Sequence, residues 1–149
     1  MKISHRAIYG IMAAVDLAMS GKEAPVQARA IARRQGIPVR FLEQVLHTMR
    51  KAGLVESVRG AQGGYLLLRA PSELSVADVL EVLEGPIFHG EAQSGHGIGR
   101  RESKEQQLLG AVWMKVQEAE RAVLAAVTID QLVERQRTID QQQNPMYHI

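Results

Sequence analysis

Residues 36–69 read GIPVRFLEQVLHTMRKAGLVESVRGAQGGYLLLR, and this stretch decides the fold. It predicts a helix over 38–52, which Pro38 can open because the N–H that proline lacks is not needed in a first turn. One face of this helix is apolar and carries Leu42, Val45, Leu46 and Met49. The opposite face, about 140° to 200° around the helix from Leu42, is polar and carries Arg40, Gln44, His47 and Lys51. The pattern predicts a helix with one side in a core and the other side free for a partner.

Two short strands are predicted after this helix, at 54–58 (LVESV) and 64–69 (GYLLLR). The turn between them, Arg59-Gly60-Ala61-Gln62-Gly63, is rich in glycine and has little bulk. Such a hairpin can approach a narrow groove, where Arg59 suits the negative potential. A phosphate-cradling loop is the alternative, but neither GxxxxGK[ST] nor GxGxxG occurs here.

The N-terminal part predicts two further helices. The first covers 4–20, with Ser4 as its N-cap and Gly21 as its end, and its expected apolar stripe is Ile8, Ile11, Met12, Val15, Ala18 and Met19. The second covers 26–35 and ends at Gly36. Two helices joined by a tight glycine turn fit a helix-turn-helix, and the hairpin that follows fits a wing. The fold class is therefore mainly α with a small β-hairpin, although the polar side of 38–52 taken alone also fits a plain solvated face.

The chain after the hairpin predicts a long helix at 104–127. Its apolar residues repeat at heptad spacing: Leu109, Val112, Val116, Ala119, Val123 and Ala126. No second long helix is expected in the chain, so this stripe predicts a dimerisation helix that packs on its copy in a second subunit. Before it, Ser75 and Asp78 predict a fourth helix ending at Gly85; after it, Thr128 and Gln131 predict the capping box of a final short helix. The expected organisation is a winged helix-turn-helix DNA-binding domain at 1–85, a flexible loop at 86–103, and a dimerisation helix with a C-terminal helix and tail at 104–149.

Charge is unevenly distributed along the 149 residues. Residues 1–70 hold eleven Lys/Arg and four Asp/Glu, a net charge of +7, whereas 71–149 hold seven and twelve, a net charge of −5. A basic half joined to an acidic half predicts that the first half meets a polyanion, here double-stranded DNA. The apolar runs are too short to span a membrane and the N-terminus has no apolar signal region, so a cytoplasmic protein is expected.

Enzyme and metal chemistry find little support in the sequence. There is no cysteine, and neither GxSxG nor HExxH occurs. The carboxylates Asp78, Glu81 and Glu84 are interpreted as a solvated helix face, and Trp113 and Met114 as packing residues. His89 and His96 have loose spacing that does not favour a metal site. No catalytic residue, metal or cofactor is expected.

Five stretches carry a resemblance to a known family: MKIS, YG, GIPVRFLEQVL, MRKAGLVESVRGAQGGYLL and DVLEVLEGPI. They resemble the Rrf-two family of winged-helix regulators, densely over 1–87. The resemblance implies a homodimeric transcription regulator, most simply a repressor, that binds a pseudo-palindromic operator. It implies that Arg40, Glu43, Gln44 and Arg59 read bases. With their neighbours, the expected DNA-binding residues are Gln27, Arg29, Arg40, Phe41, Glu43, Gln44, His47, Lys51, Arg59, Gly60, Gln62, Gly63 and Tyr65. Arg40 stands where relatives often have a small hydroxylic residue, which leaves the operator sequence open.

The resemblance also leaves the signal open. Cluster-binding members carry three cysteines in the loop after the fourth helix, and the corresponding region here, 92–107, has none. The cysteine-free branch includes repressors of sulfur and cysteine genes that work with cysteine synthase, and the terminal MYHI resembles the end of that branch. Two alternatives stay open: a protein-interaction module that docks a metabolic enzyme, and a small-molecule sensor that uses 86–103 and a groove beside the long helix.

Overall fold

The computed structural model describes residues 2–85 and 103–144 of the chain. Within those ranges the fold is mainly α, with one two-stranded antiparallel sheet, as the sequence predicts. The elements, in chain order, are α1 (His5–Ser20), α2 (Ala28–Gln35), α3 (Val39–Lys51), β1 (Val55–Val58), β2 (Gly64–Leu67), the 3-10 helix η1 (Pro71–Glu73), α4 (Val76–Glu84), α5 (Lys104–Ala126) and α6 (Ile129–Gln143).

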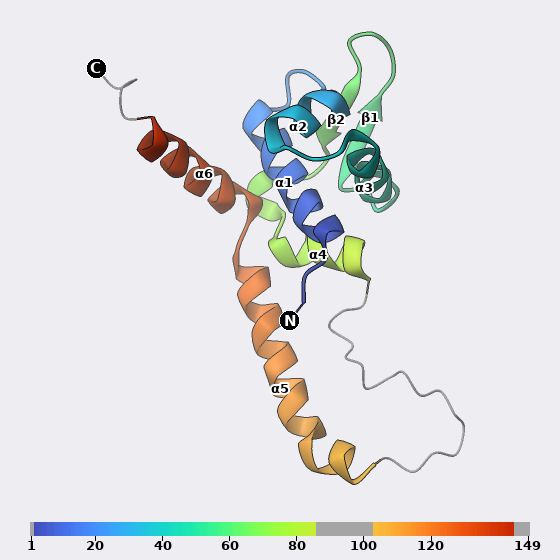
Figure 1. Cartoon of the computed structure of the whole chain (residues 1–149), viewed down its shortest axis with the longest axis vertical. Coiled ribbons are helices and arrows are strands. Elements are labelled where there is room, and N and C mark those ends of the chain that lie inside the picture. Colours follow the sequence, from blue (N-terminus) through green and yellow to red (C-terminus); the bar gives the residue numbers. More distant parts are fainter. Residues whose placement is uncertain (1, 86–102, 145–149) are drawn as a thin grey trace.

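The elements α1 to α4, with the β1–β2 hairpin, form one part of the molecule, which we call the head. Helix α1 lies at its centre, in contact with α2, α3, α4 and α6 (Figure 1). Its buried side is built mostly from small residues, namely Ala7, Gly10, Ala13 and Ala14, together with Val15 and Leu17. A Cβ added at Gly10 would overlap the side chain of Leu83 on α4, so small size is what lets the helices approach. The expected stripe is therefore wrong at Ile8 and Met19, which are exposed. On the buried face of α1, residues as large as Ile8 and Met19 would hold the neighbouring helices apart.

The predicted helix starts are confirmed. The Ser4 side chain accepts a hydrogen bond from the backbone of Ala7 at 3.2 Å, and Ser75 with Asp78 forms a reciprocal capping box. Thr128 and Gln131 form another at the start of α6. The final helix is longer than expected, however, because α6 runs 15 residues and includes QQQ, which are good helix formers. The tail residues Met146, Tyr147 and Ile149 lie outside the described residues.

The hairpin pairs Val55 with Leu67 and Val58 with Gly64, and a backbone bridge joins β2 to the segment before α2. In that bridge Val26 and Tyr65 exchange backbone hydrogen bonds of 2.8 and 3.0 Å. The hairpin is therefore fixed to the helix-turn-helix and is not a free arm. The head is a winged helix-turn-helix.

Helix α5 begins far from the head and ends at it, and α6 continues from that end in contact with α1 (Figure 1). The corner between them is fixed by backbone bonds: Val76 N–H donates to Val127 at 2.9 Å, and Ile129 N–H donates to Leu74 at 2.8 Å. Ile129 and Val133 are buried in the same core as the head. The head therefore includes part of the segment predicted for dimerisation. None of the described helices is long and apolar enough to cross a membrane.

Candidate nucleic-acid interface

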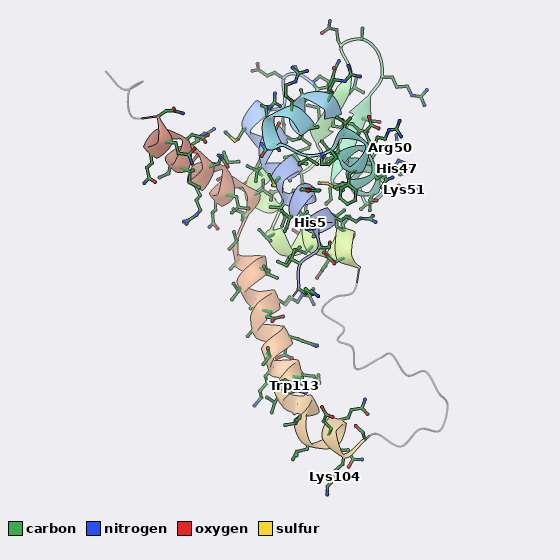
Figure 2. All side chains as sticks on the ribbon, viewed as in Figure 1. His5, His47, Arg50, Lys51, Lys104 and Trp113 are labelled. Carbon is green, nitrogen blue, oxygen red and sulfur yellow. The ribbon has the colours of Figure 1, made fainter. Side chains whose placement is uncertain are left out.

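Helix α3 has the two faces that its sequence predicts. Its apolar residues Leu42, Val45, Leu46 and Met49 are completely or almost completely buried. The residues predicted to meet DNA are exposed: Arg40, Phe41, Glu43, Gln44, His47 and Lys51. Figure 2 shows His47 and Lys51, with Arg50, at the outer edge of the head. A row of charged and amide side chains thus stands on a helix whose other side is held by the core.

The wing divides the predicted contact residues into two groups. Arg59, Gly60 and Gln62 are exposed in the turn. Gly63 is buried, and a Cβ there would overlap the backbone of Val58, so this glycine shapes the turn. Tyr65 is half-buried against the core. Gly63 and Tyr65 therefore position the wing, whereas Arg59 and Gln62 present their side chains to solvent.

Gly64 holds the base of the wing close to the helix-turn-helix. Its φ of +151° lies outside the range that L side chains readily adopt, and a Cβ there would overlap the backbone of Val26. Gln27 adds a bond from the same segment, donating from Nε2 to the Ala61 carbonyl at 3.4 Å. Arg29 is exposed on the first turn of α2. The segment that begins α2 and the wing therefore act as one unit.

Two arginines that the sequence interpretation did not select lie at the edges of the α3 face, Arg50 on α3 itself and Arg6 on α1. Arg50 Nη1 donates to the Ser57 hydroxyl of β1 at 3.1 Å, and Arg6 Nη2, from α1, donates to the Thr48 hydroxyl at 2.7 Å. Phe41, only partly covered, packs on the Tyr9 ring in a T-shaped arrangement at a centroid distance of 5.4 Å. Arg6 and Thr48 are 42 positions apart, so no local spacing pattern connects them.

An ion pair with one buried partner joins α1 to α2, and the sequence interpretation missed it. Asp16 accepts hydrogen bonds from Arg34 Nε at 3.0 Å, from Arg34 Nη2 at 2.6 Å and from Gln35 Nε2 at 2.9 Å. The hydrogen bond to Asp16 is the main cause that raises the pKa of Arg34; partial burial opposes it and the charge attraction adds to it. This network joins α1 to α2, the first helix of the helix-turn-helix.

The carboxylates of α4 are not the plain solvated face that was expected. Asp78 completes the capping box and lies 3.4 Å from Arg69, Glu81 pairs with Arg121 of α5 at 3.0 Å, and Glu84 accepts bonds from Ser4. Each therefore joins α4 to another segment. The spacing of residues in the sequence could not predict these partners, because all of them except the capping residue Ser75 are distant in the chain.

Two hollows lie beside α6. The larger, about 540 Å³, is lined by Asp16, Met19, Ser20, Arg34, Gln35, Gln136 and Asp140. The smaller, about 200 Å³, is mostly apolar and includes Ile11, Met12, Val15, Leu132 and Ile139. They lie between the head and the last helix. The loop at 86–103, which the sensor hypothesis also used, lies outside the described residues except for its last position.

The predicted stripe of α5 is largely uncovered within one chain. Val112, Val116 and Val123 are 48%, 47% and 66% exposed, Ala119 and Ala126 are also exposed, and Leu109 is half-buried. The side of α5 toward α4 carries Arg121, paired with Glu81, and Leu124, which packs on the core. Trp113 and Met114, interpreted as packing residues, are 53% and 62% exposed among the described residues.

Comparison with known proteins agrees with this geometry. Residues 3–135 match the model of the Rrf2 family, described as an iron-dependent transcriptional regulator. The chain belongs to the Rrf2 family. It is 34% identical over 132 residues to the regulator CymR of Bacillus subtilis, covering 89% of each chain. It is 32% identical over 140 residues to IscR of Xenorhabdus nematophila, covering 94% of this chain and 84% of that one.

Solved structures of relatives have the same fold. The chain superposes on CymR of B. subtilis with a TM-score of 0.75 at 32% identity, covering 91% of this chain and 98% of that one. It superposes on T. potens IscR with a TM-score of 0.76 at 35% identity, covering 99% and 97%. The Rrf2 protein described here is therefore a helix-turn-helix transcription regulator that binds DNA, and not an enzyme.

The family description names iron, but a cysteine-held iron–sulfur cluster does not fit the sequence of this Rrf2 protein. A cysteine-held cluster needs thiolate ligands, and the chain has no cysteine. Among the described residues, no three His, Asp or Glu side chains group as a metal site would need. His89 and His96 lie outside the described residues.

Proposed function

We propose that the protein binds a pseudo-palindromic operator as a homodimer, with α3 in the major groove and the wing in the adjacent minor groove. The observation that carries this proposal is the exposed polar face of α3 opposite a fully buried apolar face. A helix held in this way can enter a major groove, which is about 12 Å wide, without exposing its core. The site of action is then the cytoplasm.

The side chains on that face have chemistry that suits base edges. Arg40 can donate two bonds to a guanine, Gln44 can pair with an adenine, and Glu43 can accept from a cytosine. His47 and Lys51 suit phosphates. In the wing, the exposed Arg59 suits a narrow minor groove.

A binding experiment with the DNA upstream of the protein's own gene tests these roles. Fluorescence anisotropy should show that Gln44→Ala and Arg59→Ala each lose about 1–3 kcal/mol of specific binding, roughly a five- to 150-fold rise in Kd. Binding to a mixed-sequence duplex should change less for Gln44→Ala, because an amide carries no charge for phosphate binding. The matched control is Arg137→Ala, an exposed arginine on α6 on the far side of the head from α3 (Figure 1).

Equal loss of specific and mixed-sequence binding for Gln44→Ala would contradict base reading by α3. Unchanged specific affinity for Arg59→Ala would contradict insertion of the wing arginine. A wild-type protein with no salt-dependent affinity for either duplex would overturn the whole arrangement.

The homodimer proposal rests on α5. Its exposed apolar stripe continues for nearly three heptads and faces away from the contacts that α5 makes with α4. Uncovered valines at heptad spacing are stabilised by packing on a second helix, and a two-fold axis brings the same stripe of another copy to them. Two heads related by that axis suit two operator half-sites.

Replacing one exposed alanine of the stripe tests the dimer. Ala119→Asp should weaken dimerisation by about 3 kcal/mol, roughly 100-fold in the dimer Kd, because it buries an unpaired charge in both copies. Ala111→Asp is the matched control, since Ala111 is also exposed on α5 but lies about 110° from the centre of the stripe. Analytical ultracentrifugation measures both; equal dimer constants for the two variants would count against the stripe.

We also propose control of sulfur or cysteine genes, with a metabolic enzyme such as cysteine synthase as a partner. The support is the similarity to CymR, whose solved structure is described as that of the global cysteine regulator of B. subtilis. The terminal residues that suggested the enzyme lie outside the described ones. Transcript profiling of a deletion strain with and without added cysteine tests this; cysteine genes that stay unchanged in both media would reject it.

A further inference from the structure

The exposed face of α3 has two edges, and both carry an arginine tied to the helix. Measured around α3 from Leu42 at about 100° per residue, the face centres near about 170°, Thr48 lies near about 240° and Arg50 near about 80°. Arg50 bonds the Ser57 hydroxyl on the wing edge. Arg6 bonds the Thr48 hydroxyl on the opposite edge, which is next to the start of α1. The two arginines therefore lie on either side of the base-reading row, that is, the α3 residues Arg40, Glu43 and Gln44 that we propose to read bases.

The dimensions of DNA indicate what the two edges of α3 would contact. An α-helix with its side chains is about 10–12 Å across and the major groove is about 12 Å wide, so a helix in the groove brings its edges near the two phosphate strands. With α3 docked as proposed, the wing edge would face one strand and the α1 edge, with Arg6, would face the other. Helix α1 would then lie beside DNA, although none of its residues is proposed to read bases.

Arg6 keeps the capacity to bind an anion. A guanidinium has five N–H donors, and the one described bond uses a single donor, from Nη2. Thr48 gives its own proton to the Gln44 carbonyl at 3.1 Å, so its hydroxyl accepts from Arg6 without competing for a phosphate. Arg6 is exposed, and in the described part of the chain no carboxylate forms an ion pair with it. Glu84, the carboxylate bonded to the start of α1, is engaged by Ser4.

We propose that Arg6 binds a DNA phosphate on the strand opposite the wing, with Thr48 holding the guanidinium in place. The inference rests on the proposed docking of α3 in the major groove. It assigns to α1 a sequence-independent contact that sets the tilt of α3. The Arg6–Thr48 bond links that contact directly to the turn of α3 that carries Gln44.

The test measures salt dependence with the full-length protein and a mixed-sequence duplex of about 30 base pairs, because a phosphate contact needs no operator. Arg6→Ala should reduce the slope of log affinity against log salt by about 0.9 for each head that binds, and reduce affinity about fivefold per head at moderate salt. Affinity for the upstream region of the gene should fall by the same factor. Arg6→Lys should retain the slope, since it retains the charge.

Thr48→Val separates a phosphate contact from a purely structural brace. It removes the hydroxyl that holds Arg6 but leaves the charge, so we expect the wild-type slope and a smaller loss of affinity than for Arg6→Ala. The same loss in both variants with an unchanged slope would overturn the proposal. So would an equal slope change in the charge-matched control Arg137→Ala, which would indicate an effect of net charge.

These measurements distinguish a failure of the Arg6 phosphate contact from a failure of the proposed docking of α3 on which it rests. If the wild-type protein shows no salt-dependent binding to either duplex, the docking of α3 fails and Arg6 fails with it. If the wild-type protein binds and Gln44→Ala loses specificity, but Arg6→Ala keeps the full slope, only the phosphate site of α1 is wrong.

Discussion

Asp16 is 4% exposed while its partner Arg34 is 50% exposed, and this asymmetry governs what each substitution does. Arg34→Met leaves a buried carboxylate with Gln35 alone, whereas Asp16→Asn leaves an arginine that water can reach. We expect Arg34→Met to cost about 2 kcal/mol of unfolding free energy, less than the about 3–5 typical of a fully buried pair because Arg34 is half-solvated. Asp16→Asn should cost about 1 kcal/mol.

Urea unfolding monitored by circular dichroism measures these costs, with Arg33→Met as the control on the same helix. The pKa of Arg34 is raised, so its contribution is complete below the unfolded-state pKa and is lost only as pH rises through the folded-state value. The cost of Arg34→Met should therefore be the same at about pH 6 and about pH 8. A cost no larger than that of Arg33→Met would show that the pair adds nothing.

At the scale of elements, the wing depends on one close approach between backbones. Gly64→Ala would place a Cβ into the backbone of Val26 and open the bridge between β2 and the start of α2. We expect a loss of about 3 kcal/mol in stability. Gly60→Ala should cost only about 1 kcal/mol, because at φ +112° it strains the backbone but its Cβ meets no atom. Thermal unfolding compares the two, and equal losses would contradict the role of the approach.

Other elements follow from local sequence, and a few do not. The capping residues Ser4, Ser75 and Thr128 were predicted correctly because a cap involves only residues three positions apart. The burial of α1 was predicted less well, since its outer residues depend on which neighbours approach and how closely. The length of α6 was underestimated because its polar outer face has no periodic apolar signal.

At the scale of the whole molecule, the corner between α5 and α6 joins α5, the helix proposed for dimerisation, to the head. Ile129, fully buried at this corner, should cost about 3 kcal/mol when changed to alanine, whereas Ile139→Ala, at a position 39% exposed on the same helix, should cost less than about 1 kcal/mol. Urea unfolding at one fixed protein concentration measures both, because the proposed dimerisation would make stability depend on concentration. A similar cost for both isoleucines would mean that the corner does not hold α6 to the head.

The sequence alone determined the α-helices and strands other than the full length of α6, their order, the polar face of α3 and the glycine-rich wing, because helix faces, caps and tight turns depend on residues a few positions apart. The absence of cysteine from the sequence also excluded a cysteine-held iron–sulfur cluster. Only the tertiary structure decided which distant residues meet: Asp16 with Arg34, Gly64 with Val26, and Arg6 with Thr48. Such pairs are set by how helices pack around α1, and packing distances are a property of the folded chain that no local spacing encodes.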